Sequence, residues 1–118
     1  MNEPLADREC IPCQGGVAPL SAEAVDRFLG DLNGVTPSWE ARDGHHITKT
    51  WSFPDFKSAL AFTNAVGAES EDQGHHPDIH LAWGRVSIDI WTHKIDGLTE
   101  SDFVLAARVD RIAERMRS

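Results

Sequence analysis

The feature that most limits the fold of this chain is a pair of β-hairpin patterns. In the first, residues 39–42 and 45–53 flank Asp43-Gly44, a favoured two-residue hairpin turn, and the second arm alternates apolar with polar side chains. In the second, residues 79–83 and 86–91 alternate in the same way around Gly84-Arg85. Strands joined as hairpins lie antiparallel, so the sequence predicts a four-stranded antiparallel sheet.

Helical periodicity occurs before, between and after the two hairpins. Ser21 is a good N-cap for a first helix that stops near Asn33-Gly34, and Pro54 can occupy an early position of a second helix. Thr99 can cap a third helix, with Asp102 three residues later. The order α-β-β-α-β-β-α therefore predicts an α+β fold, a four-stranded antiparallel sheet with three helices packed on one face.

Length and composition favour one domain with a short leader. The 118 residues fall in the common range for a single domain, and 41% hydrophobic content is enough for a core. Residues 1–18 carry no periodic pattern and are expected to form an extended or mobile N-terminal arm, while residues 19–118 form the domain. Cys10 and Cys13 in the arm could be a metal half-site, a redox pair or neither. Because no second cysteine pair completes a zinc site, we favour an arm without a catalytic role.

Charge and hydropathy exclude two classes of partner. The formal net charge of −8 argues against direct nucleic-acid binding, since no run of Lys or Arg offsets it. No apolar stretch approaches the roughly 20 residues that span a bilayer, and the N-terminus lacks a signal-peptide pattern. We therefore expect a cytoplasmic protein that does not enter a membrane.

Histidines are concentrated near the second hairpin. Four of the six lie between His75 and His93, and Pro77 favours an extended conformation for His76. His93 ends the fourth predicted strand, and antiparallel pairing with the third strand would bring it beside His76. An unperturbed imidazole titrates near about pH 6.5, so several together can divide acid and base roles at neutral pH. The pattern indicates a proton-transfer site.

A metal site is the competing interpretation of these histidines. His76 and His80 are four residues apart, a spacing that suits metal ligands on a helix. In a strand, however, His80 would lie on the face opposite Ile79 and Leu81, so we expect it to face solvent and expect no metal. The aromatic residues Trp51, Phe53, Trp83 and Trp91 are expected in the core or at an interface.

The spacing of these residues resembles the signature of the pterin-4a-carbinolamine dehydratases. That signature runs from a charged residue through His-His-Pro to an aromatic residue, a third histidine and a downstream aspartate. Its matches here are Glu71, His75-His76-Pro77, Trp83, His93 and Asp102, with nine residues between Trp83 and His93. Similarity also covers the segments PLSAE, SFPDF and DGLTESD, and so most of residues 19–118.

The resemblance implies dehydration of a 4a-hydroxytetrahydropterin to the quinonoid dihydropterin, as in tetrahydrobiopterin recycling. The pterin is then the substrate, and no metal or redox cofactor is expected. His75, His76 and His93 would carry the proton transfers. The residues expected to bind the pterin are Glu71, Pro77, Asp78, Trp83, Thr92 and Asp102. Two departures from the family pattern, Gly74 before the histidine pair and Ile79 after the proline, imply altered affinity more than lost chemistry.

Assembly and an alternative function also follow from the resemblance. Family members usually form dimers or tetramers, so we expect a homodimer or homotetramer. Some relatives act as protein-binding factors, including a transcriptional coactivator and a RuBisCO assembly factor. A non-catalytic role with a protein partner is therefore the alternative to the enzyme.

Overall fold

The computed structural model describes residues 4–8, 10, 18–34 and 39–117. The elements in this part of the chain are η1 (Leu5–Asp7), α1 (Ala22–Asn33), β1 (Glu40–Arg42), β2 (His46–Ser52), α2 (Phe56–Gln73), β3 (Asp78–Ala82), β4 (Arg85–Ile90), η2 (His93–Ile95) and α3 (Glu100–Arg117). The predicted order of three helices and four strands is confirmed.

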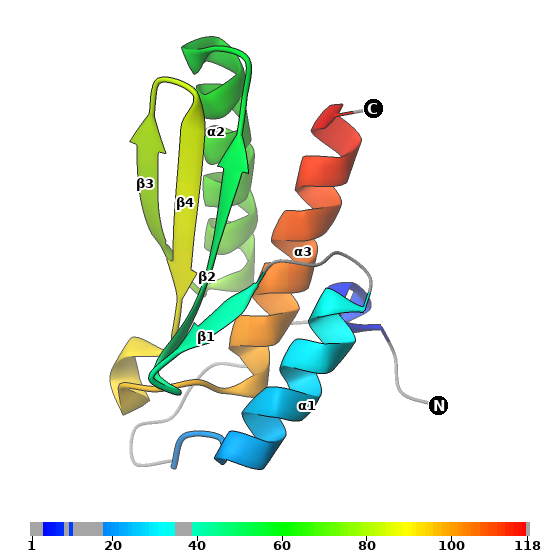
Figure 1. The fold of residues 1–118 in the computed structure, drawn as a ribbon, viewed down its shortest axis with the longest axis vertical. Coiled ribbons are helices and arrows are strands. Elements are labelled where there is room, and N and C mark those ends of the chain that lie inside the picture. Colours follow the sequence, from blue (N-terminus) through cyan, green and yellow to red (C-terminus); the bar gives the residue numbers. More distant parts are fainter. Residues whose placement is uncertain (1–3, 9, 11–17, 35–38, 118) are drawn as a thin grey trace.

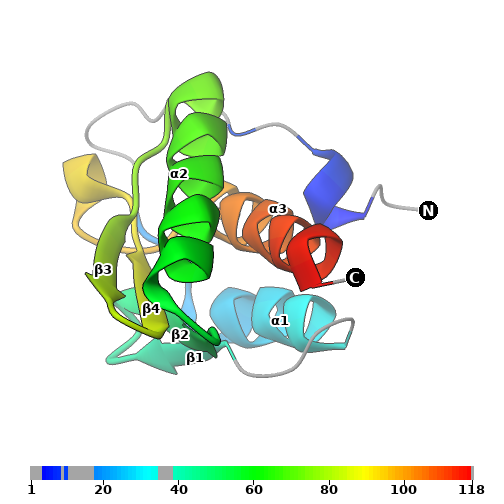
Figure 2. The same cartoon turned by 90° about the horizontal axis from the view of Figure 1, so that it is seen from above.

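The four strands form one antiparallel sheet in the order β1-β2-β4-β3. Figures 1 and 2 show the three helices on one face of this sheet, with α3 between α1 and α2. The opposite face carries polar side chains, among them Thr50 and Ser87, whose hydroxyl oxygens lie 2.9 Å apart across β2 and β4. This is the predicted α+β fold. None of the helices in the described residues combines the length and apolar character needed to cross a bilayer.

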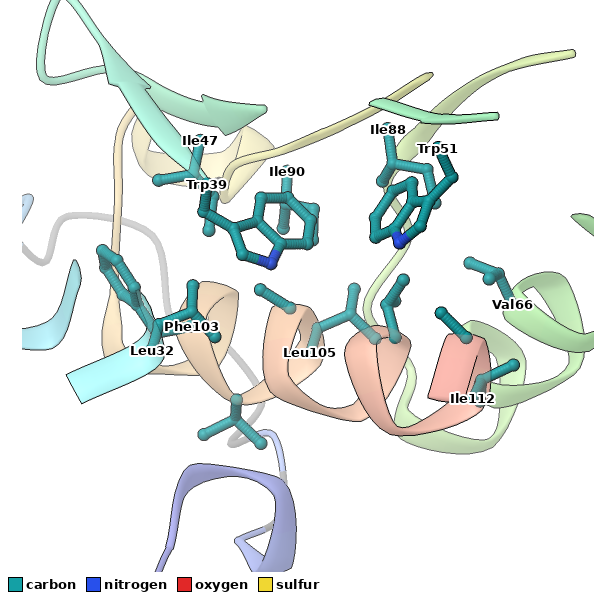
Figure 3. Close-up of a cluster of buried hydrophobic side chains, with 14 of the residues drawn as sticks. Leu32, Trp39, Ile47, Trp51, Val66, Ile88, Ile90, Phe103, Leu105 and Ile112 are labelled. Carbon is teal, nitrogen blue, oxygen red and sulfur yellow. The ribbon is translucent and has the colours of Figure 1, made fainter. Parts of the chain in front are cut away.

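The core lies between the sheet and α3. Figure 3 shows Trp51 of β2 and Ile88 and Ile90 of β4 pointing toward Phe103 and Leu105 of α3. All five side chains are buried, and burying each large apolar side chain contributes roughly 1.5–3 kcal/mol. Because β2 and β4 are the two central strands, this packing fixes the position of α3 over the middle of the sheet.

A buried ion pair joins the sheet to α3 within this core. Nζ of Lys49 in β2 donates to Oδ1 of Asp110 in α3 at 2.8 Å, and Nε1 of Trp39 donates to Oδ2 at 2.9 Å. The Lys49 ammonium also lies 5.1 Å from the ring centroid of Trp51. Burial raises the pKa of the Asp110 carboxyl in spite of these donors.

Helix α2 begins later than predicted. Its N-cap is Asp55, whose side chain accepts a hydrogen bond from the backbone N–H of Ser58 at 2.8 Å. Pro54 therefore precedes the helix instead of occupying an early helical position. The Asp55 side chain accepts a backbone N–H of the first helical turn, whereas a proline side chain has no acceptor atom. The helix therefore begins after Asp55.

Both hairpin turns differ by one residue from the prediction. Arg42 pairs with His46, so the first loop holds three residues, with positive φ at Asp43 and Gly44. In the second hairpin Ala82 pairs with Arg85, so the turn is Trp83-Gly84 and not Gly84-Arg85. The Gly84 carbonyl accepts the N–H of Phe53 at 2.8 Å, which holds this glycine in the turn.

The side chains of Trp51, His80 and Trp83 can be compared with the prediction. Trp51 is buried, and His80 faces solvent with 65% of its side chain exposed, as predicted. Trp83, expected in the core or at an interface, is 68% exposed, so it lies outside the core and its place at an interface stays a prediction. It is exposed because it lies in the turn after the last residue of β3 and is not part of the alternation of side chains along that strand.

The described part of the N-terminal arm consists of residues 4–8 and 10. Leu5–Asp7 form η1, which lies against α3 in Figures 1 and 2, and Leu5 is buried. These residues are thus in contact with the domain. Cys13, the second cysteine of the metal half-site and redox-pair interpretations, lies outside the described residues.

Candidate active site

Apart from Trp83, the predicted site residues lie in segments that meet at one end of the sheet. Helix α2 ends there with Gly74 in the left-handed conformation (φ 65°), which turns the chain into His75. Asp78 at the start of β3 pairs with Asp89 near the end of β4, which confirms the predicted antiparallel pairing. Segment η2 and the start of α3 follow at the lower end of the sheet in Figure 1.

His75 is held by a buried carboxylate. Its Nε2 atom lies 2.5 Å from Oδ1 of Asp102, whose side chain has no exposed surface, while 12% of the His75 side chain is exposed. The other oxygen of Asp102 accepts hydrogen bonds from the Thr92 hydroxyl at 2.9 Å and the Thr99 backbone N–H at 2.8 Å. Three elements, the α2–β3 connection, the end of β4 and the start of α3, therefore converge on one aspartate.

The direction of each hydrogen bond in this group follows from the donors present. The Thr92 hydroxyl donates its one proton to Asp102. The Thr99 hydroxyl, 2.9 Å away, therefore donates to Thr92. An ionised carboxylate only accepts, so Nε2 of His75 carries the proton that faces Asp102. In the neutral tautomer with the proton on Nε2, Nδ1 is the nitrogen that can accept a hydrogen bond.

His76 is paired with a second carboxylate in a more open setting. Its Nε2 atom lies 2.5 Å from Oε1 of Glu71, with 58% of the His76 side chain and 78% of the Glu71 side chain exposed. Both residues belong to the predicted site. The contact orients the ring of His76 and leaves the pair accessible from solvent.

His93 was predicted to end the fourth strand, but β4 ends at Ile90 and His93 is the first residue of η2. Backbone hydrogen bonds close the base of the loop that contains it. The N–H of Thr92 donates to the carbonyl of Gly97 at 2.9 Å, and Leu20 donates to the carbonyl of Leu98 at 2.8 Å. The exposed ring of His93 meets Trp91 edge-on, with centroids 4.4 Å apart. Because Thr92 contacts Asp102 directly, the loop that bears His93 is connected to the His75 anchor.

Sequence reasoning missed the residues that support the His93 loop. Nε2 of His45 lies 2.7 Å from Oδ1 of Asp96, and the rings of His45 and His46 pack on Trp91 at centroid distances of 5.3 and 5.9 Å. The sequence predicted these two histidines only as hairpin residues. The β1–β2 hairpin and η2 are 51 positions apart at the contact, and no local pattern signals such a pairing.

Trp83 is the one predicted site residue that stands apart. The structure places Pro77 and Asp78 next to the histidine pair, but Trp83 follows the other end of β3. The five residues of that strand span roughly 17 Å at about 3.3 Å per residue. Within one chain, therefore, Trp83 does not join His75 and His76.

The histidines are not arranged as a metal centre. Among the residues that the structure describes, no group of three or more His, Cys, Asp or Glu side chains could hold a metal ion. The carboxylate partners of His75 and His76 are different residues, Asp102 and Glu71. What the arrangement can do is hold imidazoles in defined orientations for proton transfer.

Comparisons with known proteins identify relatives that match most of the chain. A family model described as "Pterin 4 alpha carbinolamine dehydratase" matches residues 18–112. A protein of Rubrobacter xylanophilus is 53% identical over 92% of this chain and 97% of its own length. A protein of Rickettsia bellii is 46% identical over 90% of this chain and 91% of its own length. Both carry the name "Putative pterin-4-alpha-carbinolamine dehydratase".

Solved structures share the fold as well. The crystal structure of a transcriptional coactivator/pterin dehydratase from Brucella melitensis has a TM-score of 0.72 and 31% identity, and the match covers 80% of this chain and 98% of that one. A pterin dehydratase-like protein identified as a RuBisCO assembly factor in the α-carboxysome has a TM-score of 0.56 and 29% identity, over 64% of this chain and 89% of that one.

An antiparallel sheet with helices on one face, and a histidine held by a buried carboxylate at one end of that sheet, defines a small α+β protein. The sequence match across residues 18–112 then makes the assignment specific. The chain belongs to the pterin-4-alpha-carbinolamine dehydratase family.

Proposed function

We propose that the protein removes water from a 4a-hydroxytetrahydropterin and releases the quinonoid dihydropterin. The observation that carries this proposal is the His75–Asp102 pair, in which a buried carboxylate fixes one imidazole next to a second histidine. Membership of the family supports the dehydratase activity. The physiological role would be tetrahydrobiopterin recycling.

The reaction balances with proton transfers alone. The bond from C4a to the hydroxyl oxygen breaks, the lone pair of the adjacent ring nitrogen forms a C=N bond, and that nitrogen gives up its proton. The hydroxyl leaves as water after taking one proton. No electrons enter or leave, so an acid and a base in the correct positions suffice, and no cofactor is required.

We assign these transfers to His75, His76 and His93 as a group. A ring anchored through Nε2, as in His75 and His76, presents Nδ1 for accepting a proton. His93 supplies a further exchangeable proton from the neighbouring loop. We further propose that Glu71, Pro77, Asp78, Thr92 and Asp102 bind or orient the pterin and these rings, while Trp83 could contribute only from a second copy of the chain.

The test follows the decay of enzymatically generated 4a-hydroxytetrahydropterin by stopped-flow absorbance. Wild type is compared with no protein, His75→Ala, His76→Ala and His93→Ala, and loss of a general acid or base should slow the catalysed rate by about 10²-fold. His80→Ala is the matched control, because it removes an exposed imidazole from the polar face of the sheet. If folded wild type only matches the spontaneous rate, the enzymatic proposal is wrong.

A protein-binding role is the second candidate, and exposed apolar side chains favour it. Phe56 and Leu60 of α2 are 44% and 38% exposed, and Trp83 is 68% exposed. The hydrogen bond from Phe53 to Gly84 places the start of α2 beside the Trp83 turn, at the end of the sheet away from the histidines. We propose that this end supports homodimer or homotetramer formation or a protein partner. Light scattering of Leu60→Glu against wild type tests it, with a smaller particle expected.

A further inference from the structure

The described part of the N-terminal arm is fastened along α3 by directed contacts. The Arg108 guanidinium donates to the backbone carbonyl of Arg8 through Nε at 3.0 Å and also through Nη2. Another nitrogen of Arg108 donates to Glu69 of α2 at 2.9 Å. Arg111 donates to Asp7 at 2.8 Å, and Leu5 is buried in the core. The arm is therefore docked by both apolar and charged contacts.

Cys10, at the end of this docked part, bridges the two elements that deliver the His75–Asp102 pair. Its backbone N–H donates to Oε1 of Gln73 at 2.9 Å, and its thiol donates to the carbonyl of Ser101 at 3.5 Å. Gln73 is the last residue of α2, two positions before His75. Ser101 directly precedes Asp102 in the first turn of α3. Cys10 thus contacts one residue within two positions of His75 and another within two positions of Asp102.

We propose that the N-terminal arm is a positioning element of the active site, with Cys10 and Gln73 holding the end of α2 at a fixed place against the start of α3. The kinetic part of this inference rests on the proposed dehydratase function. His75 lies in the connection that follows α2, and Asp102 lies on α3, so a shift between these elements changes the distance between Nε2 and Oδ1. Proton transfer depends steeply on such geometry, and a displacement of about 1 Å can cost roughly 10²-fold in rate.

The arm adds two contacts that connect it to α2, next to the direct packing of α2 on α3. Arg108 joins Glu69 to the arm through its contact with Arg8, and Cys10 repeats the bridge one turn further along α2. The two bridges differ in chemistry, one charged and one neutral. Removing the neutral bridge alone leaves the arm docked and tests the positioning role without undocking the arm.

The kinetic experiment uses the full chain and changes Gln73. Gln73→Ala removes the acceptor for the Cys10 N–H and should lower kcat about tenfold with little change in KM, because the pterin contacts remain. Gln73→Glu keeps an acceptor oxygen and should restore most of kcat. Asn64→Ala is the matched control, since it removes an exposed amide from the same helix. Thermal melting of each variant checks that it is folded.

A second readout does not depend on the dehydratase activity. Long-range ¹H–¹⁵N spectra of the ligand-free protein report which ring nitrogen of His75 carries the proton. Gln73→Ala should lower the population protonated at Nε2, whereas Gln73→Glu and Asn64→Ala should match wild type. A role limited to stability would leave this population unchanged.

The two readouts separate the possible failures. If wild type does not accelerate dehydration but Gln73→Ala changes the His75 spectrum, the positioning role stands and the proposed function fails. If wild type is active and folded Gln73→Ala keeps both the wild-type kcat and the wild-type His75 spectrum, the positioning role is wrong.

Discussion

Nε2 of His75 lies 2.5 Å from Oδ1 of Asp102, a carboxylate with no exposed surface. Thr92 and Thr99 occupy the second oxygen of the same side chain, so the carboxylate is fixed before any ligand binds. A fixed acceptor sets both the orientation and the tautomer of the imidazole. Asp102 is thus the residue through which the fold orients the imidazole of His75.

Asp102→Asn should separate this anchoring from simple space filling. The amide has one acceptor oxygen for three donors, so at least one donor loses its partner, and we expect a loss of about 1–3 kcal/mol in the free energy of unfolding. The His75 tautomer is no longer fixed, so kcat should fall about 10²-fold. Urea denaturation and stopped-flow kinetics measure the two effects. Asp89→Asn, on the polar face near His80, is the control, and an unchanged kcat in Asp102→Asn would exclude the anchoring role.

Gly74 and Gly67 should respond in opposite directions to the same substitution. Gly74 has φ 65°, so Gly74→Ala should lower the free energy of unfolding by about 1–2 kcal/mol although nothing lies within 4 Å of the added Cβ. Gly67 lies inside α2 with equally open space, so Gly67→Ala should raise stability by roughly 0.5–1 kcal/mol. Urea denaturation of both variants gives the comparison. Equal effects at the two positions would show that the left-handed conformation of Gly74 is not what limits substitution.

Local patterns predicted the sheet and the helices because their causes are local. The alternation in β2 and β4 reports which face is buried, and Ser21 caps α1 by accepting the Ala24 N–H at 3.2 Å, as predicted. Turn boundaries were less accurate, because the pairing of Arg42 with His46 depends on the whole register of the strands. Long-range packing decides that register.

Polar contacts across long sequence separations could not be predicted. Lys49 occupies an inward position of β2, and its burial depends on Asp110, 61 residues away. The family signature named His75 and Asp102 without indicating that they touch, and nothing linked Cys10 to Gln73 across 63 residues. Such contacts depend on tertiary packing, which periodicity does not describe.

Removing one partner of the buried Lys49–Asp110 pair should lower the free energy of unfolding strongly, whereas replacing both partners by apolar residues should lower it much less. Asp110→Ala leaves the Lys49 ammonium and the Trp39 N–H without their acceptor, so we expect about 3–5 kcal/mol of destabilisation. Combining Lys49→Met with Asp110→Leu removes both charges and leaves only the Trp39 N–H without its acceptor, so it should recover most of that loss. Denaturant unfolding of the two variants and wild type measures this.

An exposed ion pair provides the reference for that experiment. Arg42 and Glu40 are 3.1 Å apart with 60% and 67% of their side chains exposed, so Glu40→Ala should change stability by less than about 1 kcal/mol. If Asp110→Ala proves as mild as Glu40→Ala, the buried pair does not hold α3 to the sheet.

Docking of the arm should be visible in the reactivity of Cys10. Burial raises the pKa of the Cys10 thiol from 9.0 to about 11, so at pH 8 the thiolate fraction is about 100-fold lower than for an unperturbed thiol. In a Cys13→Ser background, labelling by a disulfide reagent should therefore be slow in the native protein and fast in urea. Arg111→Ala, which removes the ion pair between the arm and α3 at Asp7, should accelerate native labelling.

The raised pKa of the Cys10 thiol also determines how docking of the arm changes with pH. The docked thiol binds its proton more tightly than the free thiol, so docking is favoured below pH 9.0 and weakens as the pH rises from 9.0 toward about 11. Proteolysis of the arm, followed by mass spectrometry, should therefore accelerate across this range. Cys10→Ser is the control, because its hydroxyl does not ionise in this range and its arm should show no such pH dependence. Acceleration of equal size in Cys10→Ser would mean that the pH effect arises from another group.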